Sequence, residues 1–315
     1  MRWCTSAPAN IALIKYMGKE NTPLNLPMNA SLSYTLPHLL TTVEIETSSE
    51  TEDRWEPLLS HTEFTAPPLS SAATARFLKH LAFLKQQFNY QGALIVRSAN
   101  NFPQGTGLAS SASSFSALTQ CAALALSELT QTPCPSVETQ LAWSRQGSGS
   151  SCRSFYSPWA LWEGHTVREI TLPYTKLDHQ VILIHTAEKK VSSSEAHQRI
   201  LSSPLYATRK ARAETHLRAL LDALQKQQWK RAYEICWDEF KDMHELFHTA
   251  HPPFSYITPE ATRVLETLQA AWERDQDGPL ITMDAGPNIH LLYRRDQTAL
   301  RLAQKALFSK DYDVL

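Results

Sequence analysis

The residues with the clearest chemical potential lie between positions 100 and 116, which read NNFPQGTGLASSASSFS. Gly105 and Gly107 carry no side chain, so the backbone there can approach a ligand closely. A helix is expected to follow from about Leu108, and its first N–H groups would present a partial positive charge to an anion. Hydroxyl donors are added by Ser110, Ser111 and Ser113. The pattern predicts a phosphate-binding loop, with a closely packed, small-residue helix start as the alternative.

This loop lacks the signatures of the common nucleotide-binding loops. No Gly-Lys-Ser or Gly-Lys-Thr follows the glycines at the spacing of a P-loop, and the chain has no G-x-G-x-x-G. The interpretation as a phosphate site therefore depends on other parts of the chain.

A second segment rich in hydrogen-bond donors reads RQGSGSSCRSFY over residues 145–156. Gly147, Gly149 and three serines precede Arg153, whose guanidinium can hold a carboxylate or a phosphate through two parallel hydrogen bonds. Such a loop suits an acidic substrate. A flexible serine-glycine linker is the alternative, but Phe155 is expected to be buried, which disfavours a loose linker.

Two lysines and one aspartate complete the set of candidate catalytic groups. Lys15 and Lys19 are four residues apart, a spacing that shares one face in a helix or a strand, so both could meet one ligand. Solvated lysines beside a strand are the alternative. Asp284 stands between an apolar strand and the turn 285–288, where a carboxylate can act as a base. An aspartate that caps its own turn would have the same pattern.

Length, charge and cysteine content limit the class of protein. The 315 residues suffice for about two domains. A formal net charge of −1 leaves no broad basic surface for nucleic acid or an anionic membrane, so neither partner is expected. The five cysteines are scattered and form no C-x-x-C pair, which favours a reducing compartment. Without an apolar leader or an apolar run of about 20 residues, we expect a soluble, cytoplasmic protein.

The hydrophobic pattern predicts strands mainly in the first half of the chain and helices mainly in the second. Strands are expected at 41–47, 91–99, 158–163 and 180–186, and a strand-turn-strand at 280–294. Helices are expected at 71–88, 108–129, 136–146 with Ser136 as N-cap, 194–200, 204–224, 229–247, 259–274 and 297–308. The polar, proline-bearing residues 49–68 are expected to form a hairpin or a loop. A domain boundary is placed near 176–183.

One motif points to a different class of enzyme. His244, Glu245 and His248 spell H-E-x-x-H on a predicted helix, a pattern in which two histidines bind zinc and the glutamate acts as the base of a metallopeptidase. A third ligand is poorly supported, because His251 is too close for the metzincin spacing. A zinc metallopeptidase is therefore an alternative that ranks below the phosphate-binding interpretation.

Five segments together resemble one family. NIALIKYMGK, NNFPQGTGLASSAS, GSGSSCRS, AEKKVSSS and MDAGPN match, in order and at similar spacing, motifs of the diphosphomevalonate decarboxylases of the GHMP kinase superfamily. The match extends from about residue 4 to about residue 293. The resemblance implies an α+β fold of two domains, with a ribosomal-S5-like N-terminal domain at 1–180, an α+β C-terminal domain at 181–315, and the active site in the cleft between them.

The resemblance also implies a reaction. ATP would phosphorylate the tertiary 3-hydroxyl of mevalonate 5-diphosphate with Mg²⁺ as cofactor, and loss of that phosphate and of CO2 would give isopentenyl diphosphate. A homodimer is expected on the same ground. A mevalonate 3-kinase or a phosphomevalonate decarboxylase of the same superfamily is the alternative, and the presence of both Lys15 and Asp284 favours full decarboxylation.

The matched positions carry the family's roles onto this chain. Asp284 would orient or deprotonate the 3-hydroxyl, Lys15 would keep that carboxylate ionised, and Arg153 would orient the substrate carboxylate for loss as CO2. The residues expected to bind the substrate, chiefly its diphosphate, are Tyr16, Met17, Gly18, Lys19, Arg76, Ser148, Gly149, Ser150, Ser151, Cys152, Arg153, Ser193 and Ser194. The residues expected to hold the phosphates of ATP are Gly105, Gly107, Leu108, Ala109, Ser110, Ser111 and Ser113. No magnesium ligand is assigned.

The chain departs from the family's motifs at three places. Met17 stands where the family has tryptophan, QGTGLAS replaces TAAGLAS, and residues 192–197 read SSSEAH where the family has SSR-x-GM or SST-x-GM. These changes fall near the expected contacts of the 5-diphosphate. They leave open whether the substrate carries one phosphate or two at that end.

Overall fold

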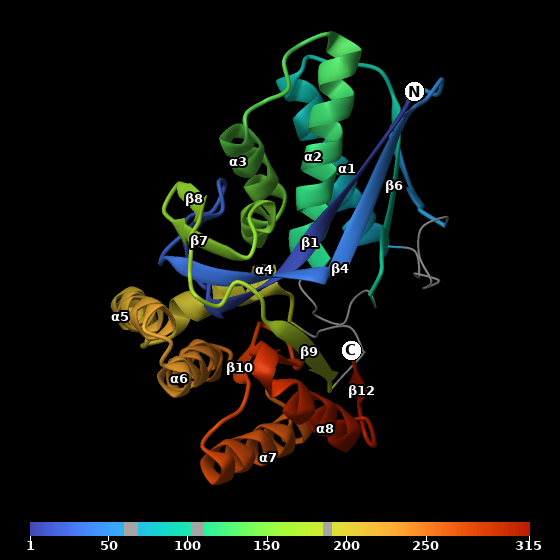
Figure 1. Cartoon of the computed structure of the whole chain (residues 1–315). Coiled ribbons are helices and arrows are strands. Elements are labelled where there is room, and N and C mark those ends of the chain that lie inside the picture. The colour runs from blue at the N-terminus through green and yellow to red at the C-terminus, as the bar shows by residue number, and fades with distance from the viewer. Residues whose placement is uncertain (60–68, 103–109, 185–190) are drawn as a thin grey trace.

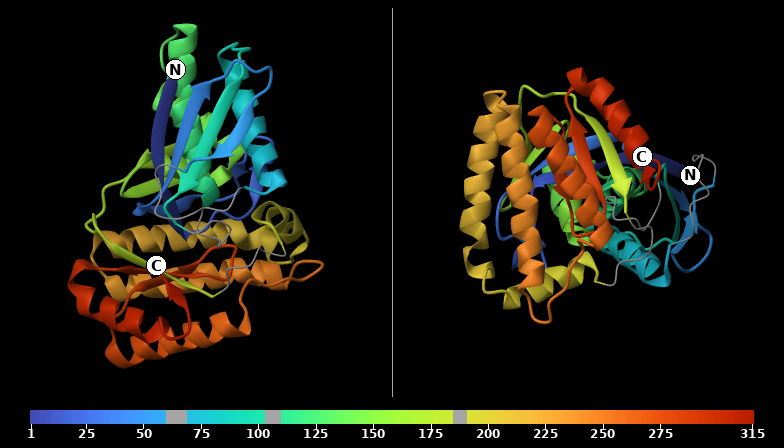
Figure 2. Two further views of the ribbon diagram at one scale, coloured as in Figure 1. Left: turned by 90° about the vertical axis from the view of Figure 1, so that its right-hand side faces the viewer. Right: turned by 90° about the horizontal axis from the view of Figure 1, so that it is seen from below.

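The computed structural model describes residues 1–59, 69–102, 110–184 and 191–315. The first half of the chain forms one body of mixed helix and sheet, and the second half forms another, which lies below it in Figure 1. Figure 2 shows the same two bodies from two further sides. Within the described residues, no helix combines the length and the apolar character needed to cross a bilayer.

A six-stranded sheet forms the first body, in the order β5-β6-β4-β7-β8 with β1 paired to β4. Its strands are β1 (Arg2–Ile14), β4 (Ser31–Thr47), β5 (Arg54–Pro57), β6 (Leu94–Asn100), β7 (Trp159–Glu163) and β8 (Thr166–Glu169). The first residues of β1 alternate in exposure, whereas its last six are all buried. A strand covered on both faces reads as a continuous apolar run, as ANIALI does. β1 therefore ends deep in the molecule, directly before Lys15.

Three helices pack beside this sheet: α1 (Ser71–Gln87), α2 (Ser110–Thr130) and α3 (Val137–Gly147), with a 3-10 helix η1 (Gly149–Phe155) after them. Phe77, Leu81 and Leu84 lie on one face of α1 and are buried against α2 and the sheet. Each such side chain contributes about 1.5–3 kcal/mol by its burial. The predicted N-cap of α3 is confirmed, because the Ser136 hydroxyl accepts a hydrogen bond from the Thr139 N–H at 3.3 Å.

The second body is built on a four-stranded antiparallel sheet in the order β10-β11-β9-β12. Its strands are β9 (Asp178–Leu183), β10 (Leu280–Met283), β11 (Ile289–Tyr293) and β12 (Asp313–Val314). Its helices are α4 (Ser193–Arg199), α5 (Tyr206–Gln225), α6 (Trp229–His248), α7 (Pro259–Asp275) and α8 (Thr298–Phe308). α6 packs against both β10 and β1, so it joins the second body to the buried end of the first.

Short elements complete the fold. β2 (Lys19–Asn21) pairs with β3 (Leu26–Pro27), and the 3-10 helices η2 (Ile200–Ser202) and η3 (Arg295–Gln297) lie next to longer helices. The predicted helices at 71–88, 136–146, 194–200, 204–224, 229–247, 259–274 and 297–308 are confirmed to within about two residues at each end.

The expectation of a hairpin or a loop at 49–68 is wrong for part of that segment. β5 lies within it and runs parallel to β6, with Trp55 opposite Val96. The Trp55 indole N–H also donates to the Ser98 hydroxyl at 2.8 Å. A strand of four residues with one large apolar side chain gives no alternation to recognise, and its partner strand lies about 40 residues further along the chain.

Candidate active site

A cavity of about 400 Å³ lies between the two bodies. From the first body, the cavity is lined by β1 and the turn after it, α1, the start of α2 and the 147–153 segment. The start of α4, α6 and the turn after β10 line it from the second. Both bodies are therefore needed to build one site.

Lys15 and Asp284 meet inside this cavity although 269 residues separate them in the chain. The Lys15 ammonium donates a hydrogen bond to Asp284 Oδ1 at 2.7 Å. The Lys15 side chain is 2% exposed, while that of Asp284 is 28% exposed and faces the cavity. The carboxylate is therefore reachable by a ligand, and its counter-charge lies behind it.

Each member of this pair keeps the other charged against the effect of burial. Burial lowers the pKa of Lys15, and the charge and hydrogen bond of Asp284 act in the opposite direction. Burial alone would raise the pKa of Asp284, but the positive charges of Lys15, His290 and Arg153 outweigh it and lower that pKa. Asp284 is therefore a carboxylate at neutral pH, ready to accept a hydrogen bond from a hydroxyl.

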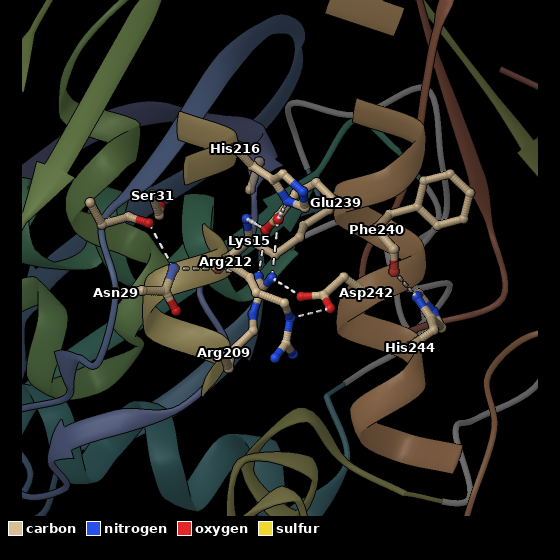
Figure 3. A network of polar contacts seen from close by, with 12 residues as sticks. Lys15, Asn29, Ser31, Arg209, Arg212, His216, Glu239, Phe240, Asp242 and His244 are labelled. Carbon is tan, nitrogen blue, oxygen red and sulfur yellow. Dashed lines mark hydrogen bonds and ion pairs between the residues drawn. The ribbon is translucent and has the colours of Figure 1, made fainter. Parts of the chain in front are cut away.

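The main chain at Lys15 is held by a buried network between α5 and α6 (Figure 3). Glu239 accepts a hydrogen bond from the Lys15 N–H at 2.9 Å, and Asn29 donates to the Lys15 carbonyl at 3.0 Å. Arg209 pairs with Glu239 and donates to the same carbonyl at 3.4 Å. Burial would raise the pKa of Glu239, but the charge of Arg209 and the hydrogen bonds lower it to about 2. The network thus fixes the end of β1 and positions Lys15.

Arg153 is the third charged group on the cavity wall. Its Nε donates to Asn10 Oδ1 at 3.1 Å and its Nη1 donates to the Ser31 hydroxyl at 2.7 Å. Its guanidinium carbon lies 5.9 Å from the centre of the Trp162 ring, within cation–π range. Burial lowers the pKa of Arg153, but a guanidinium stays charged at neutral pH. These contacts hold one edge of the planar group, which also lines the cavity.

The two serine-rich segments meet in the cavity. The Ser148 hydroxyl donates to the Ser111 hydroxyl at the start of α2 at 3.3 Å. Gly149 lies flat against the ring of Tyr16, because a Cβ at this position would be 2.6 Å from that ring. The glycine in this loop is therefore required by close packing, and the loop backbone comes within reach of the cavity floor.

Two cations and a histidine stand at another part of the wall. Arg76 on α1 donates to the Gly147 carbonyl at 3.1 Å. Burial and the nearby Arg76 charge lower the pKa of Lys19. Gly18 has a φ of +104°, and its N–H donates to His197 Nδ1 at 3.0 Å, so the turn after β1 is fixed by α4. Burial and the Lys19 charge lower the pKa of His197 to about 3, so the ring is neutral and can donate only through Nε2.

Comparison with known proteins identifies the family to which this two-domain chain belongs. Residues 7–170 match the model of the diphosphomevalonate decarboxylase-like N-terminal domain, and residues 180–312 match that of the mevalonate 5-diphosphate decarboxylase C-terminal domain. This chain belongs to the diphosphomevalonate decarboxylase family. The predicted family is therefore confirmed, and with it the two-domain α+β fold of GHMP kinase type.

Individual relatives cover nearly the whole chain. The diphosphomevalonate decarboxylase of Candida albicans is 30% identical over 91% of this chain and 83% of its own length. The crystal structure of a mevalonate diphosphate decarboxylase from Legionella pneumophila is 53% identical, covers 100% of both chains and superposes with a TM-score of 0.93. A structure described as MDDEF in complex with MVAPP, AMPPCP and magnesium is 29% identical, with 100% of this chain and 96% of that chain covered and a TM-score of 0.87.

Most residues expected in the active site line the cavity. They are Lys15, Tyr16, Met17, Lys19, Arg76, Ser110, Ser111, Ser148, Gly149, Ser150, Arg153, Ser193, Ser194 and Asp284. Gly105, Gly107, Leu108 and Ala109 lie outside the described residues. Their predicted role in holding phosphates stays a prediction.

Four of the predicted site residues lie behind the residues that line the cavity. The Ser113 hydroxyl is buried and bonded with Thr41 Oγ1 at 2.6 Å. Ser151 donates to the Ser148 carbonyl at 2.7 Å, and Cys152 Sγ lies 3.2 Å from the Gly149 carbonyl. Gly18 contributes its N–H to His197. None of these four is among the residues that line the cavity as described, so direct ligand contact by them stays a prediction.

Several lining residues escaped the sequence prediction: Asn25, Ser192, His197, Met243 and Ala285. His197 stands where the motif departs from the family's methionine, and that departure was the available signal. Ser192 adjoins two predicted serines and caps α4. Met243 lies on a helix whose apolar spacing is that of any core helix, so nothing in the sequence distinguishes it.

The zinc hypothesis for His244, Glu245 and His248 is wrong. His244 is 1% exposed and its Nδ1 donates to the Phe240 carbonyl at 2.7 Å, whereas His248 lies at the surface near the Ser255 hydroxyl. Across the described ranges 1–59, 69–102, 110–184 and 191–315, no three histidine, cysteine or acidic side chains are grouped to hold a metal ion. The motif is a chance match on α6, a helix that packs against the hydrophobic core.

The residues present fit the phosphates of ATP. α2 begins at Ser110 and has no acidic residue in its first turn, so its positive end is not neutralised where Ser110 and Ser111 line the cavity. Mg²⁺ bound together with ATP would offset phosphate charge during transfer.

Proposed function

We propose that this chain catalyses the ATP-dependent decarboxylation of mevalonate 5-diphosphate to isopentenyl diphosphate, with ADP, phosphate and CO2 as the other products. The observation that carries this proposal is the Lys15–Asp284 ion pair at 2.7 Å, which joins the two bodies inside a cavity that also contains Arg153. A carboxylate, an ammonium and a guanidinium suit a substrate with a hydroxyl, a carboxylate and a transferring phosphoryl group.

In the first step the 3-hydroxyl attacks the γ-phosphoryl group. Asp284, as an ionised carboxylate, accepts the hydrogen bond of that hydroxyl and directs its oxygen lone pair at phosphorus. Lys15 keeps Asp284 ionised and stabilises negative charge as the phosphoryl group moves. Transfer of the phosphoryl group through a loose transition state depends mainly on the position of the reacting groups and on charge stabilisation. A carboxylate of low pKa therefore suffices to orient the 3-hydroxyl.

In the second step the phosphate leaves with the electrons of the C–O bond and takes up the proton released in the first step. The C–C bond to the carboxylate breaks at the same time, and its electrons form the C=C bond of the product as CO2 departs. Arg153 is already tied to Asn10 and Ser31, so it can orient the substrate carboxylate with the rest of its planar group. Because CO2 is neutral, a cation that bound the carboxylate too strongly would oppose its loss. The partial engagement of Arg153 by protein partners limits that pairing.

The 5-diphosphate is assigned to the wall of Lys19, Arg76 and residues 148–150, with Ser151 of the same loop behind them. His197 adds a neutral ring that can donate through Nε2, close to Tyr16, whose ring centre lies 4.6 Å away. Two cations and several hydroxyl donors match a group with several anionic oxygens. This wall supports a diphosphate rather than a single phosphate.

Ser110 and Ser111 are assigned to the phosphates of ATP, together with Gly105, Gly107, Leu108 and Ala109 of the preceding loop and Ser113 behind them. A homodimer and a cytoplasmic location are retained as proposals. Sedimentation velocity of the purified protein tests the first, and fractionation of the source cells tests the second.

One assay tests the reaction. The purified protein is incubated with mevalonate 5-diphosphate and Mg-ATP, and we expect CO2 and ADP in equal amounts. ADP without CO2 would make the protein a mevalonate 3-kinase, and activity confined to mevalonate 5-phosphate would make it a phosphomevalonate decarboxylase. An Asp284→Asn variant is the control, because its amide keeps the shape and removes the charge.

A further inference from the structure

Part of the wall of the active-site cavity is apolar. Among its described lining residues, the apolar side chains without an aromatic ring are those of Ala12, Met17, Met243 and Ala285. Met17, Met243 and Ala285 belong to one hydrophobic cluster and are 3%, 2% and 7% exposed. We call these three residues the apolar wall. None of them has a part in the two chemical steps of the reaction.

Two members of the apolar wall are neighbours of the catalytic pair in the chain. Ala285 directly follows Asp284 in the turn after β10, and Met17 stands two residues beyond Lys15 in the turn after β1. Lys15 and Asp284 are joined at 2.7 Å, so the two turns meet there. Because all four residues line one cavity, Met17 and Ala285 place apolar surface beside the carboxylate that receives the hydroxyl.

Met243 completes the apolar wall from α6. It lies four residues after Glu239, and residues four apart share one face of a helix. Glu239 accepts the Lys15 N–H at 2.9 Å, so this face of α6 is turned toward the end of β1. Met243 therefore reaches the cavity from the second body. Its side chain is unbranched and polarizable, which suits contact with a small apolar group.

Mevalonate 5-diphosphate carries four different groups on C3. They are the 3-hydroxyl, a carboxymethyl group, the two-carbon arm that ends in the diphosphate, and a methyl group. The hydroxyl is assigned to Asp284, the carboxylate to Arg153, and the diphosphate to the wall that includes Lys19 and Arg76. The methyl group makes no hydrogen bond, and its transfer from water to an apolar surface is favourable. The apolar wall offers that surface.

We propose that Met17, Met243 and Ala285 form a subsite for the 3-methyl group, and that these three residues determine specificity at C3. This inference rests on the proposed function and adds a fourth contact to it. With the methyl group held beside Asp284, the 3-hydroxyl is directed at the carboxylate. Met17 is thereby assigned to C3 rather than to the diphosphate. Four unlike walls for four unlike groups also favour one enantiomer of the substrate.

The subsite should fit its ligand closely. Its side chains are backed by further buried members of the same cluster, among them Leu246 and Phe247, which are both 0% exposed. Close-packed side chains accommodate an extra methylene poorly. In a hydrophobic pocket, one methylene more or less changes kcat/KM by about 10–200-fold. Substrate analogues that differ only in the alkyl group on C3 therefore test the subsite directly.

The test compares kcat/KM for mevalonate 5-diphosphate with that for its 3-ethyl and 3-desmethyl analogues, measured as ADP formation with Mg-ATP. Met243→Ala and Met17→Ala widen the subsite, and Ala285→Val narrows it. Leu246→Ala is the matched control, because Leu246 lies on α6 in the same cluster but is not among the described lining residues. Each result is a ratio between two substrates in one variant, so a general loss of activity or of folded protein cancels.

We expect the wild type to use the 3-ethyl analogue at least about tenfold less well than mevalonate 5-diphosphate. Met243→Ala and Met17→Ala should each raise the ethyl-to-methyl ratio by about tenfold, because the deleted atoms leave room for the extra carbon. Ala285→Val should raise the desmethyl-to-methyl ratio by about tenfold, because the larger side chain occupies the place of the substrate methyl. Leu246→Ala should keep both ratios within about twofold of the wild type.

The subsite is overturned if either widening variant turns over substrate with the wild-type ethyl-to-methyl ratio, or if the wild type uses both substrates equally well. It is also overturned if Leu246→Ala raises that ratio as much as Met243→Ala does, because the effect would then be a general loosening of the cluster. An unchanged desmethyl-to-methyl ratio in Ala285→Val would remove Ala285 from the subsite. A wild-type protein that forms no ADP from mevalonate 5-diphosphate would overturn the proposed function itself, which is a different result from any change in these ratios.

Discussion

Lys15 and Asp284 show why charge, and not residue type alone, decides the chemistry of this site. Either group alone would be driven toward its neutral form by burial. Together they form a hydrogen-bonded pair at 2.7 Å, and the pKa of Asp284 lies below its ordinary value. A folded-state pKa that is lowered contributes stability above the unfolded value of about 3.9, and this contribution is lost as the pH falls through the folded value.

The first prediction concerns the pH profile of a Lys15→Met variant. Without the ammonium, burial is expected to raise the pKa of Asp284, so the acidic limb of kcat against pH moves to higher pH. We also expect kcat at pH 7.5 to fall by about 10²-fold or more, within the range for loss of one electrostatic group. Rates measured between about pH 5 and pH 9 test this.

Lys210→Met is the control for this profile, because Lys210 is exposed on α5 and does not line the active-site cavity. It should leave both kcat and the acidic limb unchanged. An acidic limb in Lys15→Met that coincides with that of the wild type would show that Lys15 does not set the charge of Asp284.

The second prediction separates the two steps at Arg153. A lysine in its place cannot keep the bonds to Asn10 and Ser31 while reaching the substrate carboxylate, because it has no planar fork. We expect Arg153→Lys to lower CO2 formation by about tenfold or more, the scale of one lost charged hydrogen bond. Parallel assays of ADP and CO2 measure this, and undiminished CO2 release would count against an orienting role.

The residue types at these positions were predictable, but their environment was not. Lys15, Arg153 and Asp284 follow from motifs with chemical meaning, and the structure brings all three to one cavity. The pKa shifts depend on a partner 269 residues away, which no local pattern contains. Ser113 shows the opposite limit, since its place in a serine run does not reveal that its hydroxyl turns into the core.

At the scale of elements, the helices could be predicted from their apolar spacing, but the polar contacts that connect them could not. α5 and α6 carry apolar spacing that identifies both as helices. Arg209 and Glu239 lie on their buried faces, where a sequence pattern expects apolar residues. The two charges pair with each other and hold the main chain of Lys15, so their role appears only when the helices and β1 are placed together.

The third prediction concerns His216, at the outer end of the polar network between α5 and α6. His216 on α5 lies against Glu239 Oε2 at 2.6 Å, and the hydrogen bond to Glu239 raises the pKa of His216 despite partial burial. A raised folded-state pKa contributes stability below the unfolded value of about 6.5, and this is lost as the pH rises through the folded value. The loss in unfolding free energy caused by His216→Gln should therefore be larger at pH 6 than at pH 9.

Urea unfolding at both pH values measures this difference. His248→Gln is the matched control, because His248 lies at the surface near the end of α6 and has no contact with Glu239 among its described partners. An equal loss at both pH values would mean that the imidazole supports Glu239 without taking a proton.

At the scale of the whole molecule, the active site is the boundary between two bodies. Each half supplies one member of the Lys15–Asp284 pair, and α6 packs against β1 as well as β10. A ligand that contacts both walls of the cavity therefore binds only when the two bodies are folded and joined. Ligand binding should therefore stabilise the native state in which the two bodies are in contact, because a ligand that binds only the native state stabilises that state.

The fourth prediction uses this linkage to separate the two ligand positions. At about 100 times its Kd, a ligand adds about 2.7 kcal/mol to the free energy of unfolding, which is about 4 °C in melting temperature for a chain of this size. We expect mevalonate 5-diphosphate and the ATP analogue AMPPCP each to raise the melting temperature of the wild type. Arg76→Ala should abolish much of the shift by mevalonate 5-diphosphate, because Arg76 belongs to the wall assigned to the diphosphate. Ser111→Ala, at the start of α2, should reduce the shift by AMPPCP instead. Equal losses for both ligands in both variants would mean that the cavity is one undivided anion site, with no separate positions for substrate and nucleotide.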